Sequence, residues 1–128
     1  MSTTLLLSAL ALASQAITST PGPELVINEQ RDVAYEQLSS GRVAEAAASL
    51  ETSLRRDPRD PATLINLGAA YARLGEGARA EQAFRAAMSS GTRYELELAD
   101  GTWDDSRAVA RRALATLDRG PALAALAR

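Results

Sequence analysis

The spacing of small and large apolar residues within residues 64–84 constrains the fold of this chain more than any other feature. The residues that carry the spacing are Leu64, Leu67, Gly68, Tyr71, Ala80 and Phe84. Steps of three and four residues place such side chains on one face of a helix. Gly75-Glu76-Gly77 separates the two groups and marks a turn between two helices. The stretch therefore predicts a helical hairpin whose helices pack closely through small residues.

An offset of 34 residues places a similar pattern on the preceding part of the chain. The matching pairs are Gly41 with Gly75, Ala46 with Ala80, Leu50 with Phe84, and Ala34 with Gly68. The last position must be small because the two helices of one unit approach each other there. A first helix is expected over 24–39 and a second over 42–56, where Asp57-Pro58 closes it. The chain thus predicts two successive helical hairpins.

This pattern resembles the tetratricopeptide repeat (TPR), a helix–turn–helix unit with the consensus W-x2-L-G-x2-Y…A-x3-F…P. The copy at 61–94 follows it best, although Thr92 stands where the terminal proline is expected. The copy at 27–60 departs at Gln30 and Gln37, which replace the large fourth residue and the tyrosine. The resemblance implies a mostly α fold of TPR-like helix–turn–helix repeats (an α-solenoid). A generic pair of helical hairpins is the alternative.

After Gly91 the apolar residues change to a period of two. Tyr94, Leu96 and Leu98 alternate with charged residues, and Asp100-Gly101 is typical of a two-residue turn. A small β-hairpin is therefore expected at 93–104, with an irregular loop as the alternative.

A C-terminal capping helix is expected from about 106 to 118, where Gly120-Pro121 would stop it. Asp104, Asp105 and Ser106 are suitable N-cap residues. The expected buried face is Ala110, Ala113, Leu114 and Leu117, and the expected solvent face is Arg107, Arg111 and Arg112.

Two repeats cannot bury their apolar faces alone, so the hairpin and the last helix are expected to cover the second unit. The residues expected to be buried there are Leu96, Leu98, Trp103, Leu114 and Leu117, against Ala83, Phe84 and Met88. On this interpretation Trp103→Ala would cost about 3–5 kcal/mol of unfolding free energy.

The first 16 residues carry no charged side chain, and residues 5–17 are largely apolar. Small residues in 11–13 and 14–16 match the −3 and −1 positions of a signal-peptidase site, so a bacterial signal peptide and a periplasmic or secreted protein are predicted. A leading amphipathic helix of a cytoplasmic protein is the alternative. The expected organisation is a signal peptide at 1–16, a linker at 17–23, two TPR-like repeats at 24–92, the hairpin and capping helix at 93–120, and a tail at 121–128.

The chain has no Cys and no His, and all 14 of its basic residues are arginine. It therefore lacks the side chains most often used for nucleophilic catalysis and zinc binding, and a net charge of −2 gives no basic face for nucleic acid. We expect no catalysis, no cofactor, no metal and no stable membrane insertion. A carboxylate-based enzyme that uses Glu95 and Glu97 is a remote alternative, and Asp104-Asp105 is interpreted as a helix cap.

The TPR resemblance implies that the first helix of each unit lines a concave groove, which holds a segment of a partner protein. The implied groove residues are Asn28, Arg31, Tyr35, Leu38 and Ser39 in the first unit, and Ala62, Ile65, Ala69, Ala72 and Arg73 in the second. Arg31 and Asn66 also match two positions of the TPRs that clamp a C-terminal carboxylate, whereas Tyr35 departs from a third. This groove would suit a peptide with apolar and acidic groups. The alternative is self-assembly into a homo-oligomer through the hairpin edge or a repeat face.

Overall fold

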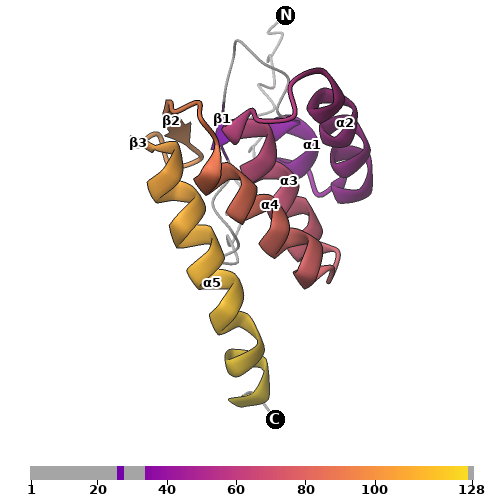
Figure 1. Cartoon of the computed structure of the whole chain (residues 1–128). Coiled ribbons are helices and arrows are strands. Elements are labelled where there is room, and N and C mark those ends of the chain that lie inside the picture. The colour runs from indigo at the N-terminus through magenta and orange to yellow at the C-terminus, as the bar shows by residue number, and fades with distance from the viewer. Residues whose placement is uncertain (1–25, 28–33, 127–128) are drawn as a thin grey trace, which may run out of the picture.

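The computed structural model describes residues 26–27 and 34–126, with side chains over 34–119. The elements are β1 (Val26–Ile27), α1 (Tyr35–Ser39), α2 (Val43–Arg56), α3 (Pro61–Arg73), α4 (Gly77–Ser89), β2 (Glu95–Leu98), β3 (Trp103–Asp105) and α5 (Ser106–Leu126). Helices α1 to α4 stack beside one another, and α5 runs along α4 before its C-terminal half extends beyond them (Figure 1). The predicted signal peptide and linker lie outside the described residues, so export stays a prediction. None of the described helices is long and apolar enough to cross a membrane.

The two helical hairpins have the same turn geometry, which confirms the repeat. Gly41 and Gly75 adopt left-handed φ values of 80° and 77°, which glycine reaches without a Cβ clash. The amide of Arg42 then donates to the carbonyl of Gln37, and that of Glu76 to Tyr71, each at 2.8 Å. Both turns therefore end a helix in the Schellman manner.

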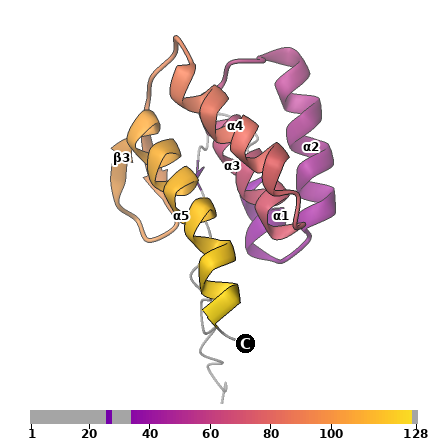
Figure 2. The ribbon, with the colours of Figure 1, turned by 60° about the horizontal axis from the view of Figure 1, so that its bottom comes forward.

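Helix α3 is the central helix of the fold. It begins at Pro61, and the buried carboxylate of Asp60 caps it by accepting a 3.0 Å hydrogen bond from the Thr63 amide. Residues 61–71 are all buried. Figure 2 shows the reason, because α3 and α4 lie between the α1–α2 pair on one side and α5 with the sheet on the other. Two apolar clusters make up the core, one around the N-terminal half of α3 and the other around its C-terminal half.

Gly68 confirms the expected close approach of the two helices in the second repeat. A Cβ at this position would lie 2.5 Å from Cε1 of Phe84, nearer than carbon atoms can pack. The ring of Phe84 is itself fully buried. Absence of a side chain at Gly68 is therefore what allows α4 to seat its aromatic ring on α3.

The strands form an antiparallel sheet in the order β1-β2-β3, so the predicted hairpin is confirmed and gains a third strand. Val26 pairs with Leu98, and Glu97 pairs with Trp103. Leu96 and Leu98 turn inward and are each 2% exposed, as expected. They share an apolar cluster with Ile65 of α3, so the sheet is held by its inner face.

The expected burial of Trp103 is wrong, because its side chain is 64% exposed. The cause is the length of the turn. A two-residue turn would place Trp103 opposite Leu98 on the inner face, but Glu97 is its observed partner and three residues, 99–101, form the loop. Gly101 has φ 82°, as in a turn that ends with one extra left-handed residue. Moving the register by one residue places the indole on the outer face.

The helix expected over 24–39 is also wrong at its start. Val26 and Ile27 form β1, and α1 begins only at Tyr35, after Ala34 in a left-handed conformation with φ 53°. Ala34 is buried but precedes α1, so it does not occupy a helical position equivalent to Gly68. Two β-branched residues favour an extended backbone, and β2 offers an edge with which they pair.

The last helix is longer than expected, because α5 continues through Gly120-Pro121 to Leu126. Local rules predict a stop there, because proline lacks an amide donor and its ring meets the carbonyl of the fourth residue before it. Ala110 and Ala113 are buried as expected, and Val109 joins them. Arg107 is partly buried, not in solvent, because its Nη2 donates a 3.0 Å hydrogen bond to the Ser90 carbonyl at the end of α4.

Candidate partner-binding surface

Part of the predicted groove is filled by the chain itself. Ile65, Asn66 and Ala69 are fully buried, so they do not line an open groove. Ile65 packs in one cluster with residues of β2 and α5, which lie where a partner segment would enter. The physical reason is that a chain with only two repeats must cover the apolar face of its second unit with other elements.

Of the remaining predicted groove residues, Asn28 and Arg31 fall outside the described residues. Leu38 lies near the end of α1, and Ala72 and Arg73 end α3. Tyr35 is the first residue of the short helix α1. Tyr35 and Ala72 are half-buried, and Leu38 is buried beneath them in the same cluster. Arg73 is exposed, and its Nη1 donates a 2.8 Å hydrogen bond to the Leu38 carbonyl at the end of α1. Both views place the turns that follow α1 and α3 at the same end of the molecule (Figures 1 and 2).

Leu74 completes this surface and was missed by the sequence analysis. It follows α3 directly and is 42% exposed, which is high for a large aliphatic side chain beside a core. We refer to Tyr35, Ala72, Arg73 and Leu74 as the α1–α3 surface. It combines an aromatic ring, aliphatic groups and a cation, which is a composition that binds apolar and acidic side chains. The consensus could not identify Leu74 because it describes the packing positions of the repeat.

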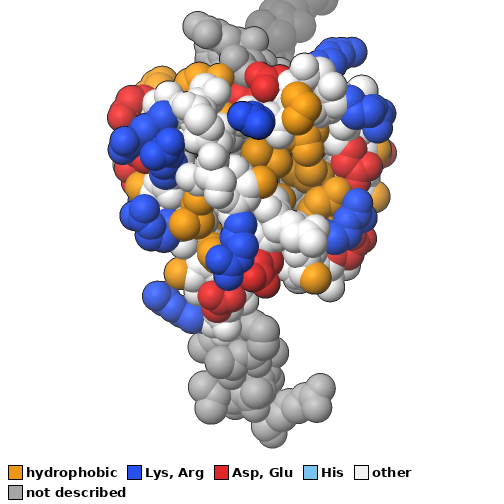
Figure 3. All heavy atoms as spheres, viewed as in Figure 1, with side chains coloured by type: hydrophobic (Ala, Val, Ile, Leu, Met, Phe, Trp, Pro, Cys, Tyr) orange, Lys and Arg blue, Asp and Glu red, His pale blue; other side chains and the backbone are white. Residues whose placement is uncertain are grey.

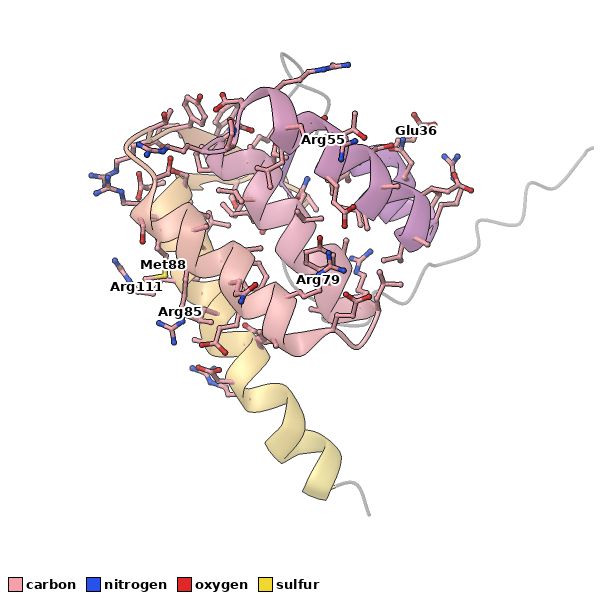
Figure 4. The ribbon with its side chains drawn as sticks, turned by 45° about the vertical axis from the view of Figure 1, so that its right-hand side comes forward. Glu36, Arg55, Arg79, Arg85, Met88 and Arg111 are labelled. Atoms are coloured by element: carbon pink, nitrogen blue, oxygen red, sulfur yellow. The ribbon has the colours of Figure 1, made fainter. Side chains whose placement is uncertain are left out.

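A polar network on the opposite side of α3 joins the two repeats, and the sequence analysis did not predict it. The Tyr71 hydroxyl donates a 2.6 Å hydrogen bond to Oε1 of Glu51 on α2. The guanidinium of Arg79 lies 4.2 Å from the centre of the Tyr71 ring and donates to Glu76 at 2.9 Å (Figure 4). Apolar side chains gather between α2 and α4 on this face, with charged groups around them (Figure 3). The network therefore closes the edge of an apolar contact between repeats.

Burial, followed by the hydrogen bond to Glu51, raises the pKa of Tyr71 to about 12. General acid–base catalysis needs a group that titrates near the working pH. A tyrosine held this far from neutrality serves as a hydrogen-bond donor, so the network is a structural link between α2 and α3.

Alkaline pH is expected to destabilise the fold through Tyr71. Its pKa is raised from 10.0 to about 12, so between these values the folded chain holds a proton that the unfolded chain has released. The free energy of unfolding therefore falls as pH rises, by at most about 2–3 kcal/mol, and the loss is complete above the folded pKa. Urea titrations between these pH values should show the fall in wild type and in Tyr35→Phe, but not in Tyr71→Phe. Equal slopes in wild type and Tyr71→Phe would contradict the assignment.

The two aspartates before α5 hold the hairpin to that helix. Oδ1 of Asp105 accepts hydrogen bonds from the amides of Arg107 and Ala108, at 3.1 and 3.3 Å, so the interpretation as a helix cap is confirmed for this residue. Asp105 also pairs with Arg93, and Asp104 pairs with Arg112; these hydrogen bonds lower the pKa of both carboxyl groups. Within the described part of the chain, no three acidic, Cys or His side chains come together in a way that could hold a metal ion.

The comparisons with known proteins agree with this geometry. A family model described as tetratricopeptide repeat matches residues 37–92. The match begins inside α1, covers α2, α3 and α4, and ends before the hairpin. No curated protein and no solved structure matches the chain. The matched residues include Ala72, Arg73 and Leu74 of the α1–α3 surface, whereas the sheet and α5 lie outside the match.

Proposed function

We propose that this chain, a tetratricopeptide repeat protein over residues 37–92, is a non-catalytic module that binds an extended or helical segment of another protein. Repeats of this family are protein–protein interaction modules. Our proposal adds which surface of this chain binds and which kind of segment it holds. The observation that carries it is the exposure of the α1–α3 surface, where the first helices of both repeats end side by side.

The chemistry of the α1–α3 surface favours a segment with one acidic and one or more apolar side chains. Arg73 uses Nη1 to hold the Leu38 carbonyl, and a guanidinium has five donors in all, so others stay available for a carboxylate. Leu74 and the exposed parts of Tyr35 and Ala72 supply apolar contact area around this cation. A partner that covers them would exclude water from the Arg73–carboxylate pair and strengthen it.

Partner recovery is expected to depend on Ala72. Ala72→Arg adds a large charged side chain to the centre of the α1–α3 surface, while partial exposure of the position allows the new guanidinium to reach water. Ala86→Arg makes the same change at an exposed position of α4 and is the matched control. In quantitative affinity capture from the native cell, Ala72→Arg should recover its specific partners at roughly tenfold lower levels, equivalent to one lost interaction hot spot.

The control variant should recover the same partners as the wild type. Both variants should melt within a few degrees of wild type, which separates a blocked surface from a damaged fold. Equal recovery by both arginine variants would remove the α1–α3 surface from consideration. Arg73→Ala is less suitable for this experiment, because it also breaks the hydrogen bond between α3 and α1.

A further inference from the structure

The outer face of the sheet presents the chain's single tryptophan beside acidic side chains. Leu96 and Leu98 point inward, so Glu95 and Glu97 lie on the outer face, and Trp103 and Asp105 stand opposite them in register. Glu95 is exposed, Glu97 is half-buried, and Trp103 is 64% exposed. We refer to Glu95, Glu97 and Trp103 as the outer sheet face. It belongs to the hairpin, so it lies outside the repeats and apart from the α1–α3 surface.

The hydrogen bonds of the hairpin bring Glu97 and Trp103 close together. The Leu98 amide donates to the Thr102 carbonyl at 2.8 Å, and the Ser106 amide donates to Tyr94 at 2.9 Å. Bonded and non-bonded pairs alternate in an antiparallel ladder, so Glu97 and Trp103 form a non-hydrogen-bonded pair. Side chains of such pairs are the closest across a sheet, with Cα atoms about 4.5 Å apart. A carboxylate therefore stands beside the indole.

The charges of this face are not balanced within the described residues. It carries three carboxylates, Glu95, Glu97 and Asp105, and only Asp105 forms an ion pair there, with Arg93. Arg93 also lies within electrostatic reach of Glu95. Glu97 forms no ion pair with any residue in the described part of the chain. An exposed aromatic ring with a neighbouring unpaired carboxylate is complementary to a cation.

We infer that the outer sheet face binds an arginine or lysine side chain carried by a segment of a partner protein. The cation would stack on the exposed indole of Trp103 while Glu97 accepts its hydrogen bonds and Glu95 adds a longer-range attraction. Arginine suits this arrangement better than lysine, because a planar guanidinium stacks on an aromatic ring and presents its donors to a carboxylate in the same plane. An anionic membrane surface does not suit it, because two carboxylates flank the ring.

The fluorescence of Trp103 provides a direct test, since the chain contains no other tryptophan. The full chain would be titrated at low ionic strength with a short synthetic peptide of alternating glycine and arginine, with lysine and glutamate peptides in parallel. We expect saturable changes in emission for the arginine peptide, weaker binding of the lysine peptide and no response to the glutamate peptide. Glu97→Gln should lower the affinity for the arginine peptide roughly threefold, which is the size of effect expected for one exposed charged contact.

Glu45→Gln is the matched control, because it removes one exposed carboxylate from α2, away from the sheet. Its affinity for the arginine peptide should equal that of wild type. Equal weakening by both variants would mean general attraction to net charge, and would overturn the site. An unchanged emission with the arginine peptide would overturn it as well.

A second copy of the chain is the competing occupant, and the same experiment detects it. If Trp103 emission shifts with protein concentration alone while light scattering shows the mass doubling, self-association uses this face and the inference of a partner segment is wrong. A constant monomer mass with an arginine-dependent shift supports the inference. Neither result depends on Ala72→Arg, so this site and the proposed function can fail independently.

Discussion

Gly68→Ala is expected to lower the free energy of unfolding by about 1–3 kcal/mol. Alanine is the better helix former by about 1 kcal/mol, so propensity alone predicts the opposite sign. The steric term outweighs it because the new Cβ would lie 2.5, 2.7 and 2.9 Å from three carbons of the Phe84 ring. That ring is fully buried and cannot move aside without shifting α4 against α3.

Urea titration of Gly68→Ala beside Gly77→Ala measures the steric term. Gly77 begins α4, and a Cβ there would meet nothing within 4 Å, so its replacement should leave stability unchanged or raise it by up to about 1 kcal/mol. A similar stability for both variants would show that α3 and α4 are not in contact at Gly68.

A second substitution can assign the cost to one pair of residues. Phe84→Leu removes part of the ring that the new methyl group would meet. The falls in unfolding free energy caused by Phe84→Leu and by Gly68→Ala should therefore not be additive. Comparing wild type, the two single variants and the double variant should give a coupling energy of about 1 kcal/mol or more, as for residues in direct contact. Additive losses would place the strain somewhere other than the Gly68–Phe84 contact.

The parts of this fold that could be predicted from sequence are those set by local rules. Gly68 must be small for the helices to approach, and Gly41 and Gly75 must reach left-handed φ values for the chain to turn. Each requirement selects a particular residue type at a fixed position of the repeat, so it can be recognised in the sequence. The hairpin is of the same kind, since alternation within residues 94–98 and a glycine at 101 specify strands and a turn.

The errors lie where local patterns do not determine the outcome. Residues 26–27 become a strand because β2, far along the chain, offers them an edge. Helix α5 continues past Pro121 although local rules predict a stop. Trp103 depends on one residue of turn length, which reverses the face of every side chain in the returning strand. Local patterns specify a strand well and specify its register poorly.

The candidate site, like the fold, could be predicted from the sequence only in part. The family consensus describes how two helices pack, and it placed the groove residues as if the repeat continued into a longer array. In this chain the array stops, so β2 and α5 cover Ile65, and Ala69 is buried in the other cluster. Among the groove residues that the structure describes, those nearest Arg73 keep an exposed surface. The surface available to a partner therefore depends on how the array is capped, which the repeat pattern does not encode.

Leu98→Ala tests this capping directly, and is expected to cost about 2–5 kcal/mol of unfolding free energy. Leu98 is 2% exposed and lies in one apolar cluster with Ile65 and Val109, so its loss leaves a cavity among the sheet, α3 and α5. Trp103→Ala removes a larger side chain from the same hairpin, yet should cost less than about 1 kcal/mol, because the indole lies outside the core. The smaller residue should thus cause the greater loss.

Urea titrations of the two variants decide between two arrangements of the second repeat. A large loss for Leu98→Ala and a small one for Trp103→Ala mean that the sheet seals the groove at Ile65, so that a partner reaches the repeats through the α1–α3 surface. The reverse order would mean that Trp103 faces the repeats and that the sheet does not hold Ile65 through Leu98. In that case Ile65 and Ala69 would be free to line a groove, and the Ala72→Arg experiment would have to be repeated there, with Ile65→Arg.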